Sequence, residues 1–298
     1  MKLLKKLLII LIVIIAVVAV STIGVYVFVR TKYDIDLFST VKELKILTED
    51  VDENKLCPNI IKDEDFPNMK STINSTVRGL VKDNVDGGYK GYYLDYEGLT
   101  LNIQKKTLVL DEQNLAALLY VGFYQNTGGK ISLGGTELDL AILQTDISFD
   151  KDKNPNETNL NIVVKLDISP LKKQMNSTLN KLFGKKIPDY LYISSNVLIT
   201  KTDLTFSYVY AENGMSVNNL NIDETTDLIK TLNKLFKIGT SKEINTEIAE
   251  VVTNALIGDI DNPGLAFSLK LVGATSFNFD KVDNKDCFLV RSVASILE

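Results

Sequence analysis

The chain has 298 residues, with 33 basic and 38 acidic side chains and a formal net charge of −5. This acidic balance is a poor electrostatic match for phosphate polymers, so we expect no nucleic-acid partner. The chain also contains no histidine, which removes the commonest general base and metal ligand and excludes a Ser-His-Asp triad. We therefore expect no metal, no cofactor and no enzymatic activity.

The first element in the chain is an uncharged apolar run from Leu7 to Val29. As a helix it would be roughly 35 Å long, enough to cross a hydrocarbon core of about 30 Å. The alternative is a cleaved signal peptide, for which Ala19-Val20-Ser21 is an acceptable cleavage site. Because apolar residues continue well past Ser21, we favour a retained transmembrane helix over residues 7–29, after a cytoplasmic leader of residues 1–6.

Charge on the two flanks predicts the orientation of this span. Lys2, Lys5 and Lys6 precede it, whereas the segment after it soon becomes acidic at Asp34 and Asp36. Positive charge on the short leading side places the N-terminus in the cytoplasm. We therefore predict a single-pass protein of the cell membrane whose C-terminal part is extracytoplasmic.

Beyond the span, residues 30–65 are predicted to form a stalk and residues 66–298 one extracytoplasmic domain. The two cysteines, Cys57 and Cys287, lie near the two ends of this exported part. Outside the cytoplasm such thiols can pair and persist. The sequence leaves two alternatives open, which are one disulfide bridge and two unrelated thiols.

In the first half of the domain the hydrophobic pattern predicts helices at about 67–82 and 112–124, the second capped by Asp111. A strand is expected over 138–149, where the apolar phase slips between Ile142 and Leu143. We interpret that slip as a bulge that bends the strand. Polar residues at 150–158 then predict a hairpin turn.

The second half alternates between the same two kinds of pattern. The expected elements, in chain order, are a strand at 160–168, a helix at 170–183, strands at 190–200 and 204–210, a hairpin turn around Glu212-Asn213-Gly214, helices starting near Asp223 and at 241, and strand pattern over 267–279. Thr240 and Glu243 form a capping box for the helix at 241. Long strands with one polar face and a few amphipathic helices favour an α+β fold, with a curved antiparallel sheet packed on helices.

Large apolar residues on the predicted strands are the candidates for a binding surface. They either fill the core, which is the default, or line a groove for an apolar ligand. The candidate groove residues are Phe206, Tyr208, Tyr210, Phe267, Leu269, Leu271 and Phe277.

The order of the parts suggests a family. A basic leader, one span, a stalk, the cap-and-helix unit Leu110–Leu119 and the strand-turn-strand stretch Ile187–Asn218 with a turn at Gly214 follow one another. In this order the chain resembles the YpmS-like membrane-anchored proteins of low-GC Gram-positive bacteria. The resemblance implies an extracytoplasmic domain similar to tubular lipid-binding folds, without a known catalytic residue.

Our leading hypothesis is a membrane-anchored, extracytoplasmic, non-enzymatic domain that binds an apolar or lipid-like ligand. The main alternative is a structural or protein-interaction module of the cell envelope, with an envelope protein as partner. A third class is a carboxylate-dependent hydrolase of wall glycans, which requires two acidic residues within about 10 Å of each other in a cleft.

Overall fold

The computed structural model describes residues 24–48, 51–83, 86–97, 99–101, 107–175, 177–202, 208–260 and 264–292. The helices are α2 (Leu37–Thr48), α3 (Glu53–Leu56), α4 (Asp65–Thr76), α5 (Glu112–Thr127), α6 (Ser169–Gln174), α7 (Ser177–Phe183), α8 (Ile222–Phe236), α9 (Ser241–Leu256) and α10 (Leu265–Leu271). The long strands are β5 (Thr107–Asp111), β6 (Lys130–Leu133), β7 (Thr136–Ser148), β8 (Glu157–Asp167), β9 (Tyr190–Lys201), β10 (Tyr208–Val217), β11 (Ala274–Val282) and β12 (Lys285–Ser292). Two-residue strands are β1 (Val77–Arg78), β2 (Val81–Lys82), β3 (Tyr93–Leu94) and β4 (Thr100–Leu101).

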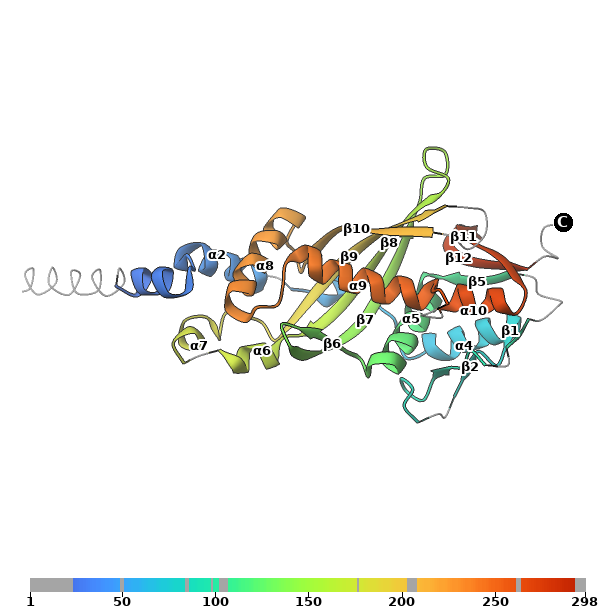
Figure 1. Ribbon diagram of the computed structural model, residues 1–298, viewed down its shortest axis with the longest axis horizontal. Coiled ribbons are helices and arrows are strands. Elements are labelled where there is room, and N and C mark those ends of the chain that lie inside the picture. The colour runs from blue at the N-terminus through green and yellow to red at the C-terminus, as the bar shows by residue number, and fades with distance from the viewer. Residues whose placement is uncertain are drawn as a thin grey trace, which may run out of the picture.

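The α+β class with antiparallel sheets is confirmed. A five-stranded sheet has the order β10-β9-β8-β7-β6, and a three-stranded sheet has the order β11-β12-β5. The molecule is elongated, with α2, α7 and α8 at one end and the three-stranded sheet at the other (Figure 1). The five-stranded sheet runs between these ends.

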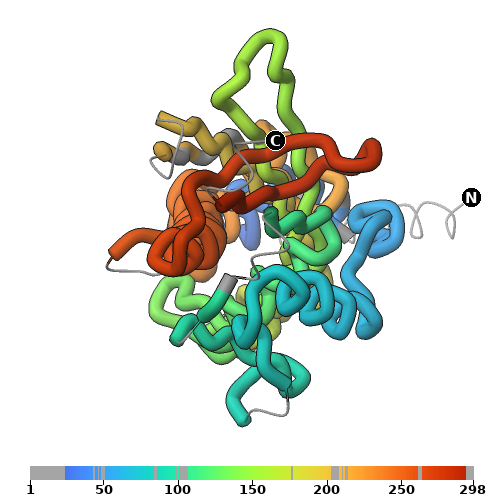
Figure 2. Tube along the Cα trace, turned by 90° about the vertical axis from the view of Figure 1, so that its right-hand side faces the viewer, coloured from blue at the N-terminus to red at the C-terminus, as the bar shows by residue number. Residues whose placement is uncertain are grey.

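The bulge predicted in β7 is also confirmed. The register between β7 and β8 shifts between Ile142 and Gln144, so one extra residue is accommodated in β7. The two strands are joined by the turn expected at 150–158, which projects away from the body in both views (Figures 1 and 2).

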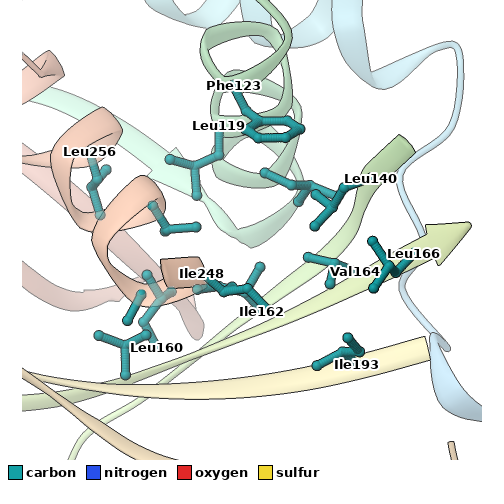
Figure 3. Close-up of a cluster of buried hydrophobic side chains, with 14 of the residues drawn as sticks. Leu119, Phe123, Leu140, Leu160, Ile162, Val164, Leu166, Ile193, Ile248 and Leu256 are labelled. Carbon is teal, nitrogen blue, oxygen red and sulfur yellow. The ribbon is translucent and has the colours of Figure 1, made fainter. Parts of the chain in front are cut away.

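Helices α5 and α9 cover the apolar face of the five-stranded sheet. Phe123 of α5 and Ile248 of α9 point toward Leu140 and Val164 of the strands (Figure 3). Fully burying side chains of this size contributes about 1.5–3 kcal/mol each. Helix α9 begins with the predicted capping box. The Thr240 side chain accepts a hydrogen bond from the Glu243 backbone N–H, and the Glu243 carboxylate accepts one from the Thr240 backbone N–H.

The strand predicted over 267–279 is wrong in its first half. Phe267, Leu269 and Leu271 lie on helix α10, and the strand β11 begins only at Ala274. The apolar spacing that looked like alternation also includes Leu265, which is four residues before Leu269 and fully buried with it on one helix face. A glycine at 273 with φ of 107° follows the helix.

Other boundaries differ from the prediction for local reasons. The helix expected over 170–183 is two helices, α6 and α7, with the break at Met175, whose backbone is extended. The turn predicted at Glu212–Gly214 is a bulge inside β10, where the register shifts between Glu212 and Met215 and Gly214 has φ of 101°. The helix expected at 67–82 is α4, which ends at Thr76 before β1 and β2.

The N-terminal region is described from residue 24, so most of the span predicted over 7–29 lies outside the described residues. Residues 24–33 are helical. Of the helices that the structure describes, none combines the length and the apolar character needed to cross a bilayer.

The segment predicted as a stalk contributes to the body. Ile35, Leu44 and Leu47 are buried in the main core. The Asn218 side chain donates a 2.9 Å hydrogen bond to the Leu47 carbonyl, and α2 packs beside α8. This part of residues 30–65 is therefore fixed against the domain and does not stand apart from it.

Candidate functional site

A groove of about 530 Å³ lies between helices α5 and α9 and is closed on one side by strand β3. We call it the α5–α9 groove. Its lining residues are Leu94, Tyr96, Gly122, Phe123, Gln125, Asn126, Thr127, Val251, Asn254 and Ala255. The volume falls within the range of small-molecule sites in proteins.

The floor of the groove is apolar and rests on the packed core. Phe123 and Val251 line the groove and also a small void beneath it, together with Ile248 and Leu140. That void measures only about 10 Å³, and Figure 3 shows the side chains of both helices converging on the strands there. Among the described residues, the floor is therefore an apolar surface backed by a void too small to hold a ligand.

One wall of the groove is held by a side-chain latch. The Gln125 side chain accepts a 2.8 Å hydrogen bond from the Leu94 backbone N–H and donates a 3.0 Å hydrogen bond to the Leu94 carbonyl. This arrangement imitates a strand partner, so a helix residue pairs with both backbone groups of a β3 residue. A Cβ added at Gly122 would lie 3.2 Å from the Leu94 side chain. Glycine at 122 thus lets β3 approach α5 closely.

The rim of the groove is polar but uncharged. Asn126 and Asn254 contribute amides from the two helices, and Gln125 contributes the amide of the latch. Burial raises the pKa of Tyr96, so its phenol remains protonated and can act as a donor. The Thr127 hydroxyl donates to the Phe123 carbonyl at 2.8 Å and serves the end of α5. The site can therefore offer hydrogen bonds without an ionic partner.

The residues predicted from the sequence to line an apolar groove do not form this site. The predicted set was Phe206, Tyr208, Tyr210, Phe267, Leu269, Leu271 and Phe277. Its described members line none of the α5–α9 groove.

Their actual positions divide them into different environments. The rings of Tyr208 and Phe277 are in edge contact at 6.3 Å, so the structure brings these two together. Phe277 and Leu269 are fully buried core residues, whereas Leu271 is 71% exposed. Residue Phe206 and the side chain of Tyr210 lie outside the described residues.

The two cysteines are both buried free thiols. Cys57 packs in a small cluster with Leu143, Val163 and Tyr192, and Cys287 lies on β12. Burial, reinforced by the nearby carboxylates, raises the pKa of Cys57 to about 11. The bridge that the sequence left open is therefore not formed in this structure.

No three histidine, cysteine or acidic residues are arranged to hold a metal ion within the described residues. Comparison of the chain with family models, with curated proteins and with solved structures finds no match.

Proposed function

We propose that this chain is a membrane-anchored, extracytoplasmic, non-enzymatic domain that binds a neutral lipid-like ligand in the α5–α9 groove. The observation that supports it is the composition of that groove, which has an apolar floor, an amide rim and, among the residues that the structure describes, no charged lining residue. The resemblance to YpmS-like proteins remains a prediction, and the proposal does not depend on it.

The lining indicates which ligands fit. Each methylene removed from water on the apolar floor contributes about 0.8 kcal/mol. An ionised head group placed between uncharged amides would lose hydration without gaining a counter-ion. The amides of Asn126 and Asn254 instead suit hydroxyl, ester or amide groups. We therefore expect a neutral amphiphile with one apolar chain.

The anchor is supported by the exposed face of the first described helix. Val25, Val27 and Phe28 are 41%, 53% and 45% exposed on residues 24–33, at one end of the elongated body (Figure 1). Arg30, Lys32 and Tyr33 follow within five residues of Phe28. Apolar side chains succeeded by an aromatic and a cationic residue are typical of the place where a span meets the membrane surface.

The groove can be tested by purifying the full chain from its own membranes and identifying bound lipid by mass spectrometry. Ala255→Phe places a ring in the groove, and Ala211→Phe is the matched control because it adds the same ring at an exposed position of β10. We expect a neutral lipid with the wild type and the control, and at least about a tenfold lower occupancy with Ala255→Phe. Equal occupancy in all three proteins would refute the site.

The topology has a separate test. Protease added to intact cells should digest the domain while the short leader stays protected. Survival of the domain with loss of the leader would show the opposite orientation. The alternative function, an envelope structural or interaction module, would be supported if purification yields a stoichiometric protein partner and no lipid.

A further inference from the structure

A second hollow, of about 500 Å³, is lined by residues of α5 and of strands β6 to β9 of the five-stranded sheet. We call it the tyrosine hollow and define it by Tyr120, Tyr124, Lys130, Asp139, Asp167 and Tyr190. It is on the other side of α5 from the α5–α9 groove, and none of these six residues lines that groove. Alternate strand residues such as Leu166 and Leu191 are buried in the core, so Asp167 and Tyr190 belong to the outer face of the sheet.

Strand register arranges four of the six residues in two cross-strand pairs. Lys130 of β6 is paired with Asp139 of β7, and Asp167 of β8 is paired with Tyr190 of β9. The β7–β8 register ends at Leu140 opposite Leu166, and Asp139 and Asp167, the next residue of each strand, both line the hollow. Directly opposed side chains have Cβ atoms about 4.5–5.5 Å apart. Lys130 and Asp139 therefore form one cross-strand pair of the hollow, and Asp167 and Tyr190 form another.

The aromatic residues of the hollow are held in place by their neighbours. Tyr120 and Tyr124 lie one turn apart on α5, and both rings contact Tyr89, at centroid distances of 4.2 and 5.3 Å. A Cβ at Gly129 would lie 2.9 Å from the Tyr124 ring, so glycine leaves room for that ring against the turn. Tyr190, by contrast, is 47% exposed and has the Lys165 ammonium group 5.0 Å from its ring centroid.

We propose that the tyrosine hollow binds a neutral sugar. The C–H faces of a sugar ring are apolar and pack on aromatic rings, and Tyr190 offers such a ring to solvent. Sugar hydroxyls both donate and accept hydrogen bonds, so they suit a rim on which carboxylates accept and ammonium groups donate. The two lysines of the rim each pair with a glutamate, Lys130 with Glu137 at 3.6 Å and Lys165 with Glu53 at 3.4 Å. The carboxylates of Asp139 and Asp167 therefore remain as acceptors for sugar hydroxyls.

The observations favour a sugar over two other uses of the hollow. An anion would be repelled by the carboxylates of Asp139 and Asp167. Within the described residues no acidic cluster is arranged for a metal ion. The proposal concerns binding only, and it stands independently of the lipid-like ligand because the two sites share no lining residue.

The test uses the full chain in lipid nanodiscs, since detergents with sugar head groups would compete. A printed array of neutral and anionic oligosaccharides of glucose, galactose and N-acetylglucosamine selects the probe. Affinity for the best soluble oligosaccharide is then measured by isothermal titration calorimetry, with empty nanodiscs as the blank. We expect a neutral oligosaccharide to bind with a dissociation constant of about 1 mM or tighter.

Three variants and one control connect the binding to the hollow. Tyr190→Ala should weaken binding about three- to tenfold, whereas Tyr190→Phe keeps the ring and should stay within about twofold. Asp139→Asn removes a charged acceptor and should weaken binding about tenfold. Phe38→Ala, which removes an exposed aromatic residue of α2 outside the hollow, should leave binding unchanged. Circular dichroism verifies that each variant is folded.

The proposal is overturned if no neutral oligosaccharide binds more tightly than about 1 mM, or if only anionic glycans bind. It is equally overturned if Tyr190→Ala and Asp139→Asn both bind as the wild type does. Loss of bound lipid in Ala255→Phe with unchanged sugar affinity would separate the two sites experimentally. Failure of the lipid test alone would leave the sugar site intact.

Discussion

The two hydrogen bonds between Gln125 and Leu94 can be tested with one substitution, because replacing the side-chain nitrogen by oxygen removes the donor of one bond and leaves the other intact. In Gln125→Glu the new carboxylate still accepts from the Leu94 N–H, as the glutamine does at 2.8 Å. Its second oxygen, however, replaces the donor that now lies 3.0 Å from the Leu94 carbonyl. Two acceptors then face each other in a half-buried wall, and the carbonyl has lost its partner.

The expected cost follows from that geometry. Leaving a buried acceptor unsatisfied costs about 1–3 kcal/mol, and the facing oxygens make the upper half of this range the better expectation. Protonation of the new carboxyl at low pH would restore a donor, so its pKa in the folded protein should lie above its unfolded value. The restored bond is then complete below the unfolded pKa of about 4.3 and is lost as the pH rises through the folded value. The deficit should therefore be small at pH 4 and full at pH 7.

Urea unfolding followed by circular dichroism, at a series of pH values, measures this deficit against the wild type. Gln174→Glu is the matched control, because Gln174 is exposed and donates to the Thr136 hydroxyl. A hydroxyl can rotate and donate where a carbonyl cannot, so the control should change stability by less than about 0.5 kcal/mol. A Gln125→Glu deficit that is absent at pH 7, or that does not vary with pH, would refute the latch.

Three further predictions follow from single residues. Thr240→Ala removes the capping box of α9 and should cost about 1 kcal/mol in urea unfolding; no change would contradict the observed cap. Burial alone would raise the pKa of Asp111, but the hydrogen bonds that it accepts and Lys285 lower it overall. The wild type should therefore be more stable than Asp111→Asn by its full margin above pH 3.8, and this margin should disappear as the pH falls through the lower pKa of the folded state. A stability difference that does not vary with pH would refute this. Cys57 and Cys287 should react slowly with a thiol reagent at pH 8 in the native protein and yield two thiols in denaturant without reductant; a disulfide-linked peptide would contradict the free thiols.

Sequence patterns gave correct predictions where the conformation depends on residues close to one another in the chain. The capping box at Thr240 and the cap at Asp111 correctly placed α9 and α5, because cap bonds join residues three positions apart. The phase slip at Ile142 correctly indicated a bulge, because a strand with one buried face must bend where its apolar residues change sides.

The candidate sites could not be predicted from such local patterns, because they are formed by residues far apart in the sequence. Over residues 265–271 the apolar spacing fits a strand as well as a helix. The segment is a helix because that conformation buries Leu265 and Leu269 in the core. Gln125 gave no signal in the chain, because its partners at Leu94 lie 31 positions away.

By itself, then, the sequence determined several of the longer helices and strands, the antiparallel α+β class and the absence of histidine chemistry, since these depend on composition and on contacts within a few residues. Only the tertiary structure decided which faces became grooves. The amide-rimmed groove requires α5, α9 and β3 to meet, and the tyrosine hollow requires the register of four strands. Both arise from the free energy of packing distant segments together, and no local pattern records that free energy.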